Sequence, residues 1–87
     1  MDSSFLEAKF INSSLVGADF RSADLQGVEF LNSDLTRALL QNSDLRGANL
    51  RHAKLSHCNI YNAKFNLSTI WPESYDPIKA GGVYIDL

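Results

Sequence analysis

Residues 18–52 read ADFRS ADLQG VEFLN SDLTR ALLQN SDLRG ANLRH when they are cut into groups of five. In this register the third place of every group is apolar, and the first place is small except at Val28. The third-place column extends in both directions without a gap and comprises Phe5, Phe10, Leu15, Phe20, Leu25, Phe30, Leu35, Leu40, Leu45, Leu50, Leu55, Ile60, Phe65 and Ile70. The first-place column comprises Ser3, Ala8, Ser13, Ala18, Ala23, Val28, Ser33, Ala38, Ser43, Ala48, Ala53, Cys58, Ala63 and Ser68.

A period of five excludes the two regular elements. In an α-helix, five residues rotate a side chain by about 140°, so the apolar column would spiral around the helix. In a straight strand, an odd period sends alternate apolar residues to opposite faces. A chain that turns by a quarter after each group can bury the whole column along one axis. The period therefore predicts an all-β solenoid, in which each coil stacks on the previous one.

The groups at 18–22, 23–27, 33–37, 43–47 and 48–52 resemble the A(D/N)LXX motif of the pentapeptide-repeat family. The resemblance covers residues 3–72 as consecutive units. It implies a right-handed quadrilateral β-helix with four units per coil, hence about three and a half coils plus a C-terminal cap. The implied domains are a β-helix over residues 1–72 and a capping tail over residues 73–87.

Composition bounds the protein class. The 87 residues carry a net charge of −2 and a single cysteine, and 45% of them are hydrophobic. This charge predicts no nucleic-acid partner by bulk attraction, and the dispersed apolar residues predict no membrane span. No charged segment followed by an apolar run opens the sequence, and a lone Cys58 makes no internal disulfide. We expect a cytoplasmic protein.

The first coil carries apolar residues at positions that should face solvent. Leu6, Ile11 and Val16 directly follow their third-place residues, and Leu31 is expected to stack beside Ile11. Later units place polar or charged residues there. An apolar patch beside an uncovered solenoid edge predicts an interface. We expect these four residues to bind a protein partner, with a homodimer as the commonest form. The alternative is that they only favour extended structure.

Acidic side chains precede the third-place residue in the middle of the array. They form an expected acidic belt of Asp19, Asp24, Glu29, Asp34 and Asp44. Some pentapeptide-repeat proteins resemble duplex DNA in width and negative charge and bind type II topoisomerases, so the alternative function is a DNA-mimicking gyrase-binding protein. This chain departs from that pattern because residues 46–71 hold four bases and no acid. The other interpretation is a solvated surface in which Asp side chains bond to turn backbone.

No catalytic signature occurs in the sequence, which lacks a nucleophile elbow, a phosphate-binding loop, an HExxH motif and a Cys-x-x-Cys pair. His52 and His57 occupy consecutive units, and no third ligand type is spaced to complete a zinc site with them. Cys58 falls in the small column, where a buried thiol is inert. We therefore expect no enzyme, no cofactor and no metal, and a non-enzymatic protein-interaction or scaffold module.

The period ends after Ile70, where the chain continues as WPESYDPIKAGGVYIDL. Pro72 and Pro77 interrupt ladder bonding, while Val83–Ile85 is expected as a short strand. Residues 69–77 resemble a Trp/Phe-Pro-Glu-x-Tyr/Phe-Asp-Pro tail that follows pentapeptide repeats in cyanobacterial members. The resemblance implies a structural cap, and a partner-binding tail is the alternative.

Overall fold

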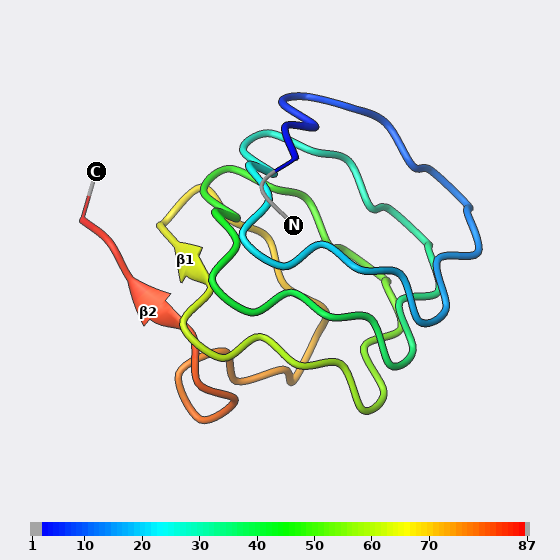
Figure 1. Ribbon diagram of the computed structural model, residues 1–87. Coiled ribbons are helices and arrows are strands. Elements are labelled where there is room, and N and C mark those ends of the chain that lie inside the picture. The colour runs from blue at the N-terminus through cyan, green and yellow to red at the C-terminus, as the bar shows by residue number, and fades with distance from the viewer. Residues whose placement is uncertain (1–2, 87) are drawn as a thin grey trace.

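The computed structural model describes residues 3–86, which wind as stacked, square-shaped coils with the earliest coil at one end and the tail at the other (Figure 1). Two short strands, β1 (Lys64–Phe65) and β2 (Val83–Tyr84), pair in parallel with Lys64 opposite Val83. The rest of the ladder consists of single parallel bridges. None of the described residues forms a helix long and apolar enough to cross a bilayer.

All the isolated bridges except Asn49–Ile70 join residues twenty apart, and together they define four faces per coil. We number the faces in chain order from the first coil. The first face carries Ser4, Asp24, Asp44 and Lys64; the second carries Lys9, Glu29, Asn49 and Ile70; the third carries Ser14, Asp34 and Lys54; the fourth carries Asp19, Leu39 and Asn59. The expectation of a β-solenoid with stacking every twenty residues is confirmed by these bridges.

A tight turn separates successive faces. The N–H of Ala23 donates to the carbonyl of Phe20 at 3.1 Å, and the later units repeat this bond as far as Ala63. The last place of every unit from Glu7 to Asn62 has positive φ, for example 58° at Asn32 and 73° at Gly47. Positive φ at the third turn residue is the requirement of a type II β-turn. His52 and His57 occupy this turn position, with φ of 61° and 57°.

The apolar column fills the axis. Leu25, Phe30, Leu35, Leu40, Leu45 and Leu50 are all fully buried. The small column lies inside the corners, where Ala38, Ser43 and Ala48 are also fully buried. Its buried hydroxyls are satisfied by backbone carbonyls: Ser43 Oγ donates to Leu40 at 2.7 Å within its own turn, and Ser33 Oγ donates to Phe10 of the preceding coil. The two columns together therefore form the core.

The predicted register is wrong at the last repeat. Asn49 pairs with Ile70, twenty-one residues later, and Ile70 is 46% exposed while Thr69 is 8% exposed. Thr69, rather than Ser68, thus takes the small column, and Trp71, rather than Ile70, takes the apolar column above Leu50. The extra residue lies in the turn that follows Phe65.

Side-chain hydrogen bonds explain why this longer turn is stable. Asn66 Oδ1 accepts from the N–H of Gly47 and from the N–H of Ser68, both at 3.1 Å. Thr69 Oγ1 donates to the carbonyl of Leu45 at 2.8 Å. The bonds to Gly47 and Leu45 span neighbouring coils, so the register depends on residues about twenty positions away.

The tail folds against the last coil. Trp71 stacks on Tyr75 with ring centroids 5.3 Å apart, and Phe65 meets Trp71 and Tyr84 edge-on at 5.5 and 5.7 Å. β2 then continues the first face above Lys64 (Figure 1). A Cβ at Gly82 would lie 3.0 Å from the Pro77 carbonyl oxygen, so this close approach favours glycine. Leu87, the end of the expected cap, lies outside the described residues.

Candidate functional site

The four predicted partner-binding residues do not form one patch on the side of the coil. Leu6, Ile11 and Val16 are 58%, 44% and 51% exposed, but each lies in a different turn and so at a different corner. Only Ile11 and Leu31 stack, because the N–H of Asn12 donates to the carbonyl of Leu31 at 3.0 Å. Leu31 is half-buried. Leu6, Ile11 and Val16 share a surface only at the N-terminal end of the stack.

That end exposes a row of backbone groups that sequence reasoning missed. In the second coil, the N–H of Asp34 donates to Ser13 and its carbonyl accepts from Leu15, at 2.9 and 2.8 Å. The residues in the same places of the first coil are exposed, and no backbone partner among residues 3–86 reaches them. They are Ser4, Lys9, Ser14 and Asp19. We call these four residues and the turns between them the N-terminal edge.

An aromatic cluster supports the N-terminal edge from inside. Phe5 meets Phe10 and Phe20 edge-on, with ring centroids 6.0 and 5.4 Å apart. Phe10 stacks on Phe30 at 5.7 Å. Phe5 and Phe10 are half-buried, whereas Phe30 is fully buried. Part of this aromatic cluster is thus accessible at the N-terminal end of the stack.

The residues of the expected acidic belt lie on all four faces, and hydrogen bonds tie most of their carboxylates to their own turns. Asp19 accepts from Arg21 Nε and Nη2 at 2.9 and 2.7 Å. Asp44 makes the same contacts with Arg46. Asp24 Oδ1 accepts from Gln26, and Asp34 Oδ1 accepts from Thr36. Glu29 reaches the next coil, where Asn49 Nδ2 donates to its Oε1 at 3.2 Å.

These contacts shift the acidity of three carboxyls. The Arg21 side chain, followed by its backbone N–H, holds the pKa of Asp19 well below its ordinary value of 3.8. The hydroxyl and N–H of Thr36 lower the pKa of Asp34. Partial burial acts to raise the pKa of Asp44, but the hydrogen bonds from Arg46 outweigh it and leave that pKa lowered.

We expect the fold to lose stability in acid for this reason. A carboxyl whose folded pKa is lowered stabilises the fold above its unfolded pKa of about 4, and the contribution disappears as pH falls through the folded pKa. The thermal midpoint should therefore fall between about pH 5 and pH 2. The triple variant Asp19→Asn, Asp34→Asn, Asp44→Asn should flatten this dependence, and Glu73→Gln in the exposed tail is the control. An unchanged slope in the triple variant would contradict the assignment.

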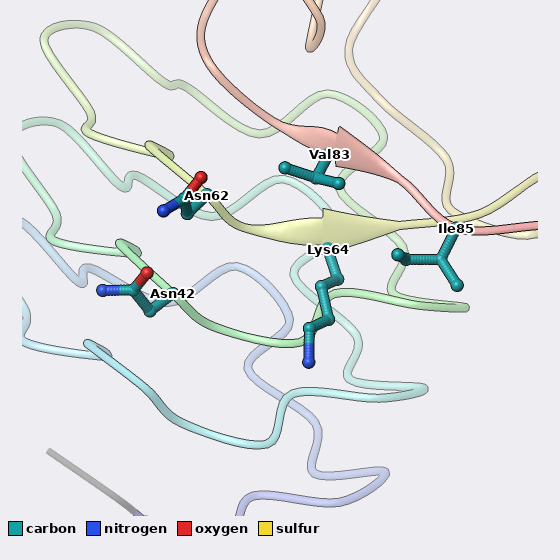
Figure 2. A pocket seen from close by; sticks show the side chains of 5 residues that line it. All are labelled: Asn42, Asn62, Lys64, Val83 and Ile85. Carbon is teal, nitrogen blue, oxygen red and sulfur yellow. The ribbon is translucent and has the colours of Figure 1, made fainter.

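Two open hollows lie on the sides of the stack. Figure 2 shows the first, of about 340 Å³, where Lys64 points away from Val83 and Asn42 and Asn62 lie on successive coils. The second, of about 270 Å³, is lined by Arg51, His52, Ile70, Trp71 and Glu73. Arg51 Nε donates to His52 Nε2 at 3.3 Å. Neither hollow contains a nucleophile with an adjacent base.

The remaining reactive groups are enclosed or dispersed. Burial raises the pKa of the Cys58 thiol to about 12, and burial together with Cys58 raises the pKa of Tyr75 to about 12. Residues 3–86 contain no cluster of three His, Cys, Asp or Glu side chains that could hold a metal ion. The N-terminal edge combines exposed apolar side chains with backbone groups that have no partner among residues 3–86.

The comparison with protein families decides the identity of the array. A family model described as a pentapeptide repeat region matches residues 1–72. The chain belongs to the pentapeptide-repeat family. The stacked four-faced coil of this pentapeptide-repeat protein agrees with that membership. No curated protein matches the chain.

Solved pentapeptide-repeat proteins of cyanobacteria share the fold of this one. The protein alr5209 of Nostoc Pcc 7120 is 29% identical with a TM-score of 0.61, over 97% of this chain and 78% of that one. Rfr23 of Cyanothece 51142 is also 29% identical, with a TM-score of 0.77, over 78% of this chain. This pentapeptide-repeat protein covers only 46% of Rfr23. The similarity therefore concerns the β-helix and assigns no partner.

Proposed function

We propose that this chain is a non-enzymatic protein-binding module, built on a right-handed β-helix of about three and a half coils with a C-terminal cap. It binds through the N-terminal edge. The observation that supports this is the combination of exposed Leu6, Ile11 and Val16 with the unpaired backbone groups between them. A sheet edge flanked by apolar side chains is a template for another chain.

The energetics favour a partner at this end. Binding there removes apolar corner side chains from water, at roughly 25 cal/mol per Å² of apolar surface. It also pairs backbone groups in a site where water is excluded, which strengthens each hydrogen bond. At the opposite end, the backbone groups of the first face are not available to a partner, because β2 already pairs with β1 there. The lone Cys58 thiol suits a reducing cytoplasm as the place of action.

The test compares capture of protein partners by the wild type and by the variant Ile11→Lys plus Val16→Lys. Both residues are exposed, so the variant should keep its fold and lose partner capture and self-association. The matched control is Ser56→Lys plus Leu67→Lys, which adds the same charge at exposed turn positions of later coils. Equal capture by the edge variant and the control would contradict the proposal.

A further inference from the structure

The N-terminal edge ends the stack with a broad, shallow face. The molecule measures 30 × 28 × 19 Å. The ladder from Ser4 through Asp24, Asp44 and Lys64 to Val83 accounts for the shortest dimension, since five layers about 4.8 Å apart span about 19 Å. The end face therefore offers up to about 800 Å², which is the area each partner buries in a stable protein interface.

The backbone pattern of the edge is suited to antiparallel pairing. In the second coil, Asp34 directs both its N–H and its carbonyl toward the preceding coil, where they bond to Ser13 and Leu15. In the first coil, the residue in the equivalent place on each face directs both groups out of the stack. Two such residues that face each other in an antiparallel pair exchange two hydrogen bonds. The edge presents four of them in chain order, at Ser4, Lys9, Ser14 and Asp19.

We propose that a second copy of this chain covers the N-terminal edge, related by a two-fold axis that passes through the Ile11–Asn12 turn. This inference rests on the proposed function and names its partner. An antiparallel copy reads the edge in reverse, so Ser4 pairs with Asp19 of the copy and Lys9 pairs with Ser14. Each pair occurs twice, so all four faces of both copies gain their missing backbone partners.

The side chains fit this order. Ile11 lies beside Ile11 of the copy at the axis, and Leu6 shares a corner with the Val16–Gly17 turn of the copy. All three exposed apolar residues of the edge thus meet apolar neighbours. Lys9 and Asp19 each face a serine, so no like charges are opposed.

A shift by one face fails in either direction. One shift places Lys9 opposite Lys9 of the copy, so that like charges meet, and it leaves Asp19 without a backbone partner. The other shift pairs Lys9 with Asp19 and brings Ser4 of the copy opposite Asp24. That place is already occupied by Ser4 of the same chain, which stacks on Asp24 one full turn earlier, so the Ser3–Ser4 segments of the two copies would clash. The end-to-end reversal is the arrangement that satisfies charge and space together.

The first experiment uses charge at the axis. Wild-type protein should be a dimer by light scattering at micromolar concentration. Ile11→Lys and Ile11→Glu should each weaken the dimer by at least about tenfold, because like charges meet at the axis. A mixture of the two variants should restore it as a heterodimer. Ser56→Lys, which alters the corresponding place of a later unit, should dimerise as the wild type does.

The second experiment reports the register by disulfide formation in a Cys58→Ala background. Residues that exchange two hydrogen bonds have Cα atoms about 5.5 Å apart, within the range that a disulfide spans. A mixture of Lys9→Cys and Ser14→Cys chains should form a cross-linked dimer under mild oxidation. Neither variant should cross-link efficiently alone.

The outcomes separate the inference from the proposed function. A monomeric wild type overturns the inference, while the capture assay with the edge variant still decides the proposed function. Efficient cross-linking of Ser14→Cys with itself overturns the axis position. A dimer that Ile11→Lys leaves intact also overturns the inference, because association then uses another surface, and the capture assay again decides the proposed function.

Discussion

Alanine in place of Trp71 is expected to lower the free energy of unfolding by about 3 kcal/mol, whereas alanine in place of Ile70 lowers it by less than about 1 kcal/mol. The difference arises from the one-residue shift in the last repeat. The N–H of Leu50 donates to the carbonyl of Ile70 at 2.7 Å, which directs the next side chain, Trp71, onto the core. Ile70 itself is 46% exposed.

Trp71→Phe is the informative companion to this pair. Trp71 Nε1 is buried and has no hydrogen-bond partner among the described residues, so phenylalanine keeps the ring contacts and removes an unpaired donor. We expect Trp71→Phe to stay within about 1 kcal/mol of the wild type. Urea denaturation of the wild type, Trp71→Ala, Trp71→Phe and Ile70→Ala, all at the same protein concentration, measures these differences. A larger loss of stability for Ile70→Ala than for Trp71→Ala would contradict the one-residue shift and place Ile70 in the apolar column.

Phe30→Ala is expected to cost about 3–5 kcal/mol, which is a large part of the stability of a domain of this size. Phe30 is fully buried and contacts Phe10 and Phe20, each at a centroid distance of 5.7 Å. Its removal leaves a cavity between two coils, and the backbone ladder on both sides prevents collapse into it. In a stack of coils, an interior defect also weakens the coupling between the parts that it separates.

Phe5→Ala provides the matched control for Phe30→Ala. Phe5 belongs to the same aromatic cluster, but it lies half-buried in the first coil, where its loss leaves an indentation rather than a closed cavity. We expect roughly half the cost of Phe30→Ala. Chemical denaturation measures both costs, provided that the free energy of unfolding depends on denaturant concentration with the same slope in both variants. If the cavity causes the loss of stability in Phe30→Ala, then Phe30→Leu, which fills most of that cavity, should recover most of the loss. Equal costs for Phe5→Ala and Phe30→Ala would contradict this account of the core.

Much of the candidate site was accessible to sequence reasoning, but its shape was not. The exposure of Leu6, Ile11 and Val16 follows from their place after the apolar residue of each unit. Their separation onto three corners follows from the turns between faces, and it divides the expected single patch. The backbone groups of Ser4 and Ser14, which have no partner among residues 3–86, occupy the place that bonds to the preceding coil in every later unit, and the period of five predicts that place. The sequence allows two interpretations of the acidic belt, and the structure confirms the one in which Asp side chains bond to turn backbone. The Oδ1 atoms of Asp19, Asp34 and Asp44 each accept from the backbone N–H two residues later.

The sequence by itself determined the architecture, because a period of five is a local rule that every unit obeys independently. Each unit needs only an apolar residue for the axis, a small residue for the corner and a last residue that accepts positive φ. The tertiary structure alone decided the register at residues 66–71 and the surface that the first coil presents. Both depend on contacts between residues about twenty positions apart, such as Asn66 with Gly47 and Thr69 with Leu45. A one-residue slip changes little within a unit, but it exchanges Ile70 for Trp71 in the core, and only packing against the coil below makes that choice.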